Sequence, residues 1–182
     1  MGRTVDSETV VKPGKMAHFV LRVRNLRDSI DWYSKVLGME IVHDGGFIAF
    51  LTYDDEHHRM AMVETPVKDD LPDNAAGLDH VAYTLADLGE LLGTYKRLKA
   101  LDILPVWPIN HGLTTSIYYA DPDGNRVEFQ VENLGTKDEL NGYMRSDAFA
   151  ENPIGVDFDP EKLLARYENG DPLEELVQFG SA

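Results

Sequence analysis

The strongest constraint in this sequence is an internal repeat. Residues 17–23 (AHFVLRV) and 79–85 (DHVAYTL) both read as strands, and each has a histidine at its second position, His18 and His80. The same offset of 62 residues relates two further pairs, Leu26 with Leu88 and Tyr33 with Tyr95. Such a repeat predicts two copies of one supersecondary unit that cannot cover its own sheet alone, so the copies should pack together around a shared interior.

Each copy is predicted to contain a strand, a helix and three further strands. In the first copy Ile30, Tyr33 and Val36 recur at helical spacing, and Gly38 is a suitable stop signal. This pattern favours an α+β fold in which two paired βαβββ modules form an open, barrel-like mixed sheet. After the first strand, the predicted elements of the first copy are a helix over Leu26–Leu37 and strands over Glu40–Val42, Phe47–Tyr53 and Arg59–Glu64; those of the second are a helix over Leu88–Ala100 and strands over Ile103–Val106, Ser116–Tyr119 and Arg126–Val131.

The remaining segments differ in composition from the two copies. We expect a polar arm over residues 1–15, module one over 16–65, an Asp- and Pro-rich linker, module two over 77–132 and a C-terminal extension over 133–182. The extension shows little periodicity up to residue 158, and then two Asp-Pro pairs signal the starts of short helices at Pro160 and Leu173. The sequence leaves open whether this helical tail is a lid, a brace or a dimer contact.

Composition excludes several classes of function. With 17 basic and 32 acidic residues the formal charge is −15, which argues against a nucleic-acid partner. The chain has no cysteine, so any metal must be held by His, Asp or Glu. An apolar run long enough to span a bilayer and a signal-peptide pattern are both missing from the sequence, which predicts a cytoplasmic protein with no membrane partner.

Two histidines and one glutamate are the candidate metal ligands. A single histidine on an apolar strand is usually a hydrogen-bonded core residue, but His18 and His80 occupy equivalent positions, and the pseudo-twofold relation directs both to the same central space. Glu128 lies between Val127 and Phe129 and therefore projects from the opposite strand face, where a buried carboxylate needs a partner or a cation. Two imidazoles and one carboxylate form the facial triad of non-haem Fe(II) oxygenases, although zinc or manganese accepts the same ligands.

Further polar side chains are candidates for the same site. If residues 121–125 form the whole hairpin loop, Tyr118 lies directly opposite Glu128 and its phenol projects to the same side; the alternative is an edge tyrosine in water. His57 and His58 are predicted to begin a strand, so that at most one faces the interior, where it could shuttle protons; otherwise the pair is exposed to solvent. His111 lies in a loop that could overhang the cavity.

These residues resemble the vicinal oxygen chelate superfamily, which is built from paired βαβββ modules, and within it the single-domain type I extradiol ring-cleaving dioxygenases. The resemblance covers residues 15–132 and is carried by residues 16–21, 56–61 and 116–128. It implies that the paired modules enclose a metal site in which His18, His80 and Glu128 hold Fe(II), with Mn(II) or Zn(II) as alternatives. It also implies an O₂-dependent enzyme that cleaves a small aromatic diol resembling catechol or 2,3-dihydroxybiphenyl.

The resemblance also implies roles for other residues. His58 matches a non-ligand histidine that serves O₂ activation and acid–base steps, Tyr118 matches a tyrosine that hydrogen-bonds a catecholic oxygen, and His111 lies where another pocket histidine is often found. Small members commonly form oligomers, so we expect a dimer. The expected pocket is apolar and lined by Val20, Phe19, Trp107, Leu113 and Ile117.

Two rival functions share this fold. Glyoxalase I and related non-redox isomerases commonly use a fourth ligand from the end of the first module, but Ala61 occupies the position that corresponds to Glu128, and Glu64 substitutes for it only if the strand register differs. The other rival is a metal-free ligand-binding protein, like bleomycin-resistance relatives, in which the interior histidines pair with carboxylates. The His58 and Tyr118 pair favours the dioxygenase through the resemblance.

Overall fold

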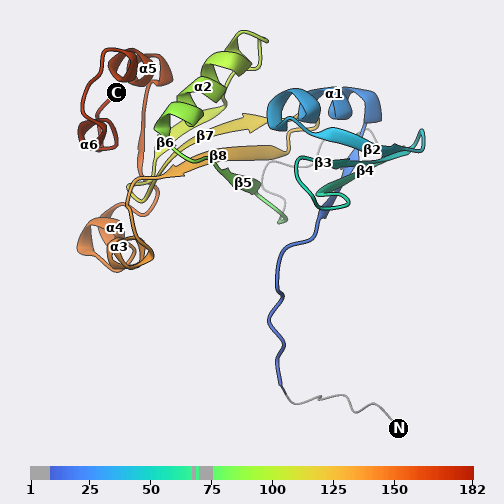
Figure 1. Ribbon diagram of the computed structural model, residues 1–182, viewed down its shortest axis with the longest axis horizontal. Coiled ribbons are helices and arrows are strands. Elements are labelled where there is room, and N and C mark those ends of the chain that lie inside the picture. Colours follow the sequence, from blue (N-terminus) through green and yellow to red (C-terminus); the bar gives the residue numbers. More distant parts are fainter. Residues whose placement is uncertain (1–8, 67–68, 70–75) are drawn as a thin grey trace. The chain divides into compact units, whose positions relative to one another are not determined.

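The computed structural model describes residues 9–66, 69 and 76–182, which form two compact units that divide at residues 68 and 69 (Figure 1). The predicted N-terminal arm and linker lie partly outside the described residues. The α+β class with two βαβββ units is confirmed, because each unit contains an open mixed sheet and the elements follow one another in the predicted order.

Unit 1 is the first repeat copy. Its sheet has the strand order β1-β4-β3-β2, with β1 and β4 parallel and the other pairs antiparallel. Helix α1 starts at Asn25, whose side chain accepts hydrogen bonds from two backbone N–H groups, and stops at Gly38 in the left-handed conformation. The elements are β1 (Phe19–Val23), α1 (Leu26–Leu37), β2 (Glu40–Asp44), β3 (Ile48–Thr52) and β4 (Met60–Glu64).

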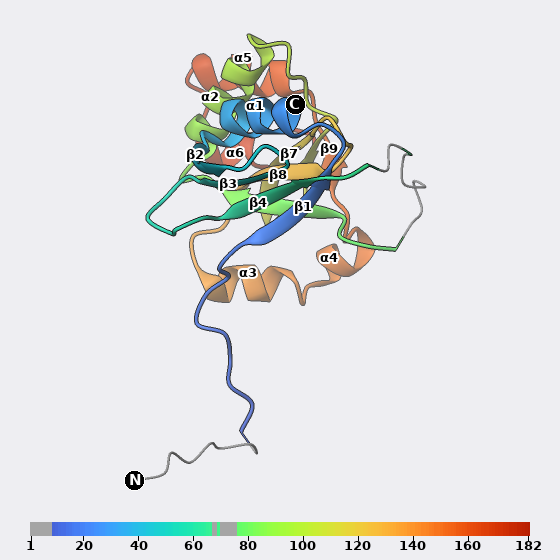
Figure 2. The ribbon, with the colours of Figure 1, turned by 90° about the vertical axis from the view of Figure 1, so that its right-hand side faces the viewer.

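The predicted apolar face of α1 is confirmed. Ile30, Tyr33 and Val36 are buried where the helix crosses β3 and β4, and Figure 2 shows α1 along one face of this sheet. In β1 the same face receives Leu21 and Val23, whereas Val20 on the other face is 55% exposed. Unit 1 therefore has one covered and one open sheet face.

Unit 2 repeats this topology and adds a strand. Its order β5-β8-β7-β6 reproduces the order of unit 1, and the short strand β9 joins at the outer edge of β6. The βαβββ elements are β5 (His80–Thr84), α2 (Leu88–Lys99), β6 (Trp107–Asn110), β7 (Thr114–Ala120) and β8 (Arg126–Glu132). The extension supplies α3 (Lys137–Tyr143), α4 (Asp147–Glu151), β9 (Val156–Asp157), α5 (Pro160–Glu168) and α6 (Leu173–Leu176).

One strand prediction for unit 2 was wrong. The strand expected at Ile103–Val106 begins at Trp107 instead, because the Ile103 N–H bonds to the Leu98 carbonyl at the end of α2 and Pro105 has no N–H to donate. The segment before residue 158 contains α3 and α4, which are short and bury none of their residues fully, so they leave no apolar period to detect. The predicted helix starts at Pro160 and Leu173 are confirmed.

The extension packs onto both sides of the unit 2 sheet. Helix α5 contacts α2, and the Tyr95 hydroxyl donates a hydrogen bond to the Glu161 carboxylate. Both ribbon views place α3 and α4 on the opposite side of this sheet (Figures 1 and 2). None of the helices in the described ranges has the length and apolar character that a membrane crossing requires.

Candidate functional site

The face of the unit 2 sheet opposite α2 gathers the predicted site residues of the second module. Strands β7 and β8 pair antiparallel with Tyr118 directly opposite Glu128 and Ala120 opposite Arg126, which confirms the predicted five-residue hairpin loop. Directly opposed residues share a sheet face, so the phenol and the carboxylate project to the same side. Ile117 lies on the other face of the sheet, fully buried opposite Phe129. The expectation that it lines the pocket beside Tyr118 was therefore wrong.

Glu128 is a buried carboxylate with imidazole partners. The residue is only 4% exposed, and its Oε2 lies 3.0 Å from His80 Nε2 on the neighbouring parallel strand β5. On the other side of the ring, His80 Nδ1 donates a hydrogen bond of 2.7 Å to Asp79. His80 is thus held through Nδ1, and its Nε2 faces the buried carboxylate.

His111 completes this cluster. It follows β6 in the turn before β7, and its Nε2 lies 3.2 Å from the Tyr118 hydroxyl and 4.0 Å from Glu128 Oε1. Burial, and after it the charge of Glu128, raises the pKa of Tyr118, so the phenol keeps its proton at neutral pH. A neutral phenol is suited to hydrogen bonding rather than to acting as a base.

Aromatic rings border the cluster. The Trp107 ring lies 5.0 Å from that of Tyr118 and 5.9 Å from that of His111, and its Nε1 donates to Asp157 of the extension. Leu113 is half-buried in the same turn as His111. The half-buried Trp107 ring thus lies beside polar groups, an arrangement that suits a planar ligand.

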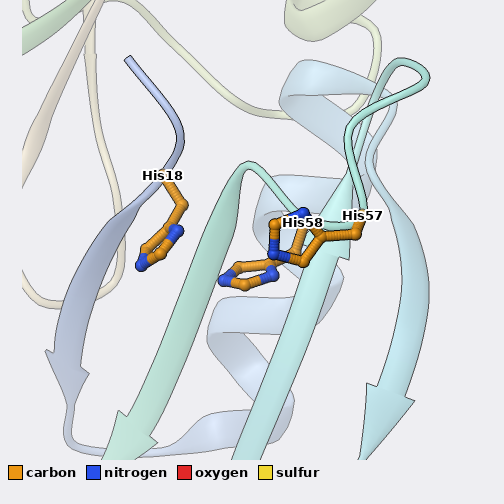
Figure 3. Close-up of side chains that lie close together, drawn as sticks. All are labelled: His18, His57 and His58. Atoms are coloured by element: carbon orange, nitrogen blue, oxygen red, sulfur yellow. The ribbon is translucent and has the colours of Figure 1, made fainter. Parts of the chain in front are cut away.

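Unit 1 contains a second cluster, made of three histidines (Figure 3). One ring nitrogen from each of His18, His57 and His58 lies within 4.8 Å of the others, and the rings of His18 and His58 are 4.3 Å apart. Burial, followed by the neighbouring His18 and His57, lowers the pKa of His58. His58 is therefore biased toward the neutral form, in which one ring nitrogen can accept a proton.

The sequence-based placement of His57 and His58 on a strand was wrong. They lie in the loop between β3 and β4, because β4 starts only at Met60. The alternation of side chains along a strand therefore does not separate them, and the centroids of their rings are 4.3 Å apart. The Glu56 carboxylate accepts a hydrogen bond of 2.8 Å from His57 Nδ1, and Lys15, followed by His57, lowers the pKa of Glu56 to about 2.

The acids that hold His57 and His80 were not predicted. Glu56 and Asp79 each directly precede the histidine that they bind, so an Asp-His or Glu-His pair was the available signal. Hydrogen bonds of this kind commonly orient histidine ligands of metals.

The predicted pocket residues of β1 lie on different faces. His18 is exposed directly before the strand, Val20 is on the open face, and Phe19 is on the face of Leu21 that α1 covers. The structure thus brings His18 together with His58, and His80 together with Glu128, Tyr118 and His111. The combination of His18 with His80 and Glu128 stays a prediction.

The donor chemistry fits a divalent first-row metal. Two ligands about 2.1 Å from one ion and at a right angle are about 3 Å apart, which matches the separation between His80 Nε2 and Glu128 Oε2. A cation at this point also offsets the cost of burying the Glu128 charge. The three imidazoles of unit 1 are alternative nitrogen donors, of which His57 and His58 are not in the predicted ligand set.

The strand register tests which residue of module one is equivalent to Glu128. Ala61 pairs with Val20 in the parallel β1–β4 ladder, and Glu128 pairs with Ala82 in the parallel β5–β8 ladder. Because Val20 and Ala82 are related by the repeat, Ala61 occupies the position equivalent to Glu128, as predicted. The Glu64 carboxylate instead accepts a hydrogen bond of 3.0 Å from the Leu26 N–H at the start of α1.

Comparison with known proteins matches the region that contains the two repeat copies to a known family. Residues 15–129 match the model of the Glyoxalase/Bleomycin resistance protein/Dioxygenase superfamily. A biphenyl-2,3-diol 1,2-dioxygenase of Rhodococcus globerulus is 43% identical over 90% of this chain and 86% of its own length. A lactoylglutathione lyase of Neisseria meningitidis is 32% identical over 66% of this chain and 93% of its own length.

Solved structures show the same fold at low sequence identity. A glyoxylase/bleomycin resistance protein/dioxygenase domain from a Frankia species superimposes with a TM-score of 0.59 at 18% identity, over 69% of this chain and 96% of that domain. The family match over most of the βαβββ region and the two repeated sheets lead to one assignment. The chain belongs to the glyoxalase/bleomycin resistance protein/dioxygenase superfamily.

Proposed function

We propose that this protein is an extradiol dioxygenase, which uses O₂ to open the aromatic ring of a catecholic diol beside its two hydroxyl groups. The observation that carries the proposal is the cluster on the β7–β8 face, where a buried carboxylate, an imidazole, a phenol and a second imidazole meet beside the half-buried Trp107 ring. The 43% identity to a biphenyl-2,3-diol 1,2-dioxygenase over 90% of the chain supports the same activity.

We propose that His18, His80 and Glu128 hold the catalytic ion and that this ion is Fe(II); Mn(II) and Zn(II) accept the same donors. When bound, the ion supplies coordination sites for the diol oxygens and O₂ and the electrons that O₂ activation needs. Asp79 fixes the His80 ring through Nδ1 and so presents Nε2 as the ligand atom.

The remaining side chains orient the diol and move its protons. Tyr118 stays protonated and hydrogen-bonds a diol oxygen, while the Trp107 ring beside it supports the aromatic ring of the substrate. His58, neutral and held between His18 and Phe50, accepts a proton from the diol and returns it at a later step. The net charge of −15 disfavours a strongly anionic substrate through long-range repulsion.

A lyase activity like that of the Neisseria relative is the main competing function. Ala61 argues against it, since the position equivalent to Glu128 in module one carries no ligand atom and Glu64 is bound to the start of α1. The three-ligand set leaves more open positions, which a bidentate diol and O₂ both require.

The test is a direct assay of the full-length protein. We expect protein loaded with Fe(II) without oxygen to convert 2,3-dihydroxybiphenyl or catechol to a yellow ring-opened product when air is admitted, with O₂ and diol consumed in equal amounts. Glu128→Gln should bind less iron and form no product. Full iron occupancy with no O₂ uptake for either diol, or turnover of lactoylglutathione instead, would refute the proposal.

A further inference from the structure

The C-terminal extension forms part of the unit 2 sheet next to the site. Strand β9 pairs antiparallel with β6, aligning Asp157 with Ile109 and Val156 with Asn110. Beyond it, the Phe158 N–H donates to the Pro108 carbonyl, and the Asp157 carboxylate accepts from Trp107 Nε1 at 2.8 Å. The extension thus covers the edge of β6 that would otherwise expose its backbone.

The segment just before β9 reaches the catalytic cluster itself. His111 Nδ1 hydrogen-bonds the backbone carbonyl of Ile154. A carbonyl oxygen only accepts, so Nδ1 carries the ring proton, and in the neutral imidazole Nε2 is then an acceptor. The nearest hydroxyl to Nε2 is that of Tyr118, at 3.2 Å. His111 Nε2 is therefore an acceptor for the Tyr118 O–H, beside the Glu128 carboxylate that also hydrogen-bonds this hydroxyl, and the lone pairs of the phenol oxygen are left available to the substrate.

Gly155 makes this approach possible. Its φ of +114° is rarely adopted by residues with a side chain, and a Cβ there would collide with the Asn110 carbonyl oxygen and lie 2.8 Å from His111 Cα. The Asn152 side chain closes the loop around it by accepting from the Gly155 N–H at 2.9 Å and donating to the Gly155 carbonyl at 2.8 Å. The loop therefore packs directly against the turn that carries His111.

We propose that residues 152–157 are a positioning element of the active site: the Ile154 carbonyl, brought close by Gly155, sets the tautomer and orientation of His111 and, through it, the direction of the Tyr118 hydrogen bond. This assigns the extension a role that the βαβββ modules do not supply. The inference deepens the proposed function and rests on it for its catalytic consequence, but the tautomer and the loop contact stand apart from the activity.

A pair of glycine variants tests the element. Gly155→Ala adds both the strained φ and the collision, whereas Gly170→Ala adds only the strain, because Gly170 has a φ of +85° and an added Cβ meets no described heavy atom within 4 Å. We expect Gly155→Ala to lower kcat at least tenfold and Gly170→Ala to leave it within twofold of wild type. In a His111→Ala background Gly155→Ala should change kcat less than twofold, since it acts through a ring that is no longer present.

The second readout does not depend on activity. ¹H–¹⁵N correlation of the histidine rings in the full-length protein should show His111 with its proton on Nδ1, and this tautomer should be lost in Gly155→Ala and kept in Gly170→Ala. If Gly155→Ala fails to fold, Asn152→Ala, which only opens the loop, replaces it. A proton on Nε2 in the wild type, or an unchanged tautomer in both loop variants, would overturn the inference. A tautomer that responds in a protein without dioxygenase activity would overturn the proposed function alone.

Discussion

Asp79 offers a sharp test of the metal site, because it touches a proposed ligand without being one. Its Oδ2 accepts a hydrogen bond of 2.7 Å from His80 Nδ1, and its Oδ1 is paired with Arg126. The hydrogen bond with His80 and the charge of Arg126 lower the pKa of Asp79, so the carboxylate is ionised at neutral pH. Asp79→Asn keeps an acceptor for His80 but removes the charge that makes the ring a better ligand.

The expected size of the effect follows from the exposure of Asp79. Loss of a group that orients a histidine ligand typically weakens metal binding about 10- to 100-fold. The Asp79 side chain is 64% exposed, so water screens its charge and the lower end applies, about tenfold or ~1.4 kcal/mol of binding free energy.

The assay is a competition titration of Fe(II) against a chelator under anaerobic conditions with the full-length protein. Arg126→Gln is the matched control, because it removes the other partner of Asp79 and leaves the contact with His80; it should change the affinity less than about threefold. An Asp79→Asn protein that binds iron as tightly as wild type would refute the assignment of His80 as a ligand held through Nδ1.

Three further outcomes are expected. His57→Gln should keep iron content and turnover within about twofold of wild type, whereas His58→Gln should keep iron but lose turnover by about 10²-fold or more. Metal analysis measures the iron content of both variants, and loss of iron in His57→Gln would assign the ion to the three-histidine cluster instead. Tyr118→Phe should lower kcat/KM at least tenfold while thermal unfolding changes by only a few degrees, since the lost hydrogen bond contributes about 1 kcal/mol; a larger loss of stability would contradict this role. The hydrogen bond from Lys99, followed by that from Tyr95, lowers the pKa of Glu161, so its stabilising contribution is present above the ordinary glutamate pKa of about 4.3 and is lost as the pH falls through the lower folded value. The stability difference between wild type and Glu161→Gln should therefore shrink in acid unfolding curves as the pH falls from about 4.3 through that lower value, and a constant difference would exclude this linkage.

The repeat and the hairpin could be predicted because they depend on local sequence. The offset of 62 residues between His18 and His80 indicates that their two strands are equivalent. A loop of five turn-forming residues determines which residues face each other across β7 and β8. From these two facts the pairing of Tyr118 with Glu128 and the position of Ala61 both follow. Strand alternation then decides which face each side chain takes.

The contacts that sequence reasoning missed join segments far apart in the chain. No local pattern relates His111 to Ile154, 43 positions away, because the contact is to a backbone carbonyl that every residue possesses. The strand expected over His57 and His58 is a loop, since the first residue of β4 is Met60. Propensity alone does not locate where a ladder begins, because pairing with the neighbouring strand decides it.

The alanine at position 61 shows how closely two chemistries can lie within this fold. In each half of the chain a pair of parallel strands carries one side chain at an equivalent position. This side chain is the methyl group of Ala61 in the first half and the carboxylate of Glu128 in the second. An acid at that position would bring a negative charge into a buried place, where a paired side chain or a cation has to compensate it. Members of such a duplicated architecture could therefore diverge by exchanging one residue at these equivalent positions at a time, while the pairing of the parallel strands remains unchanged.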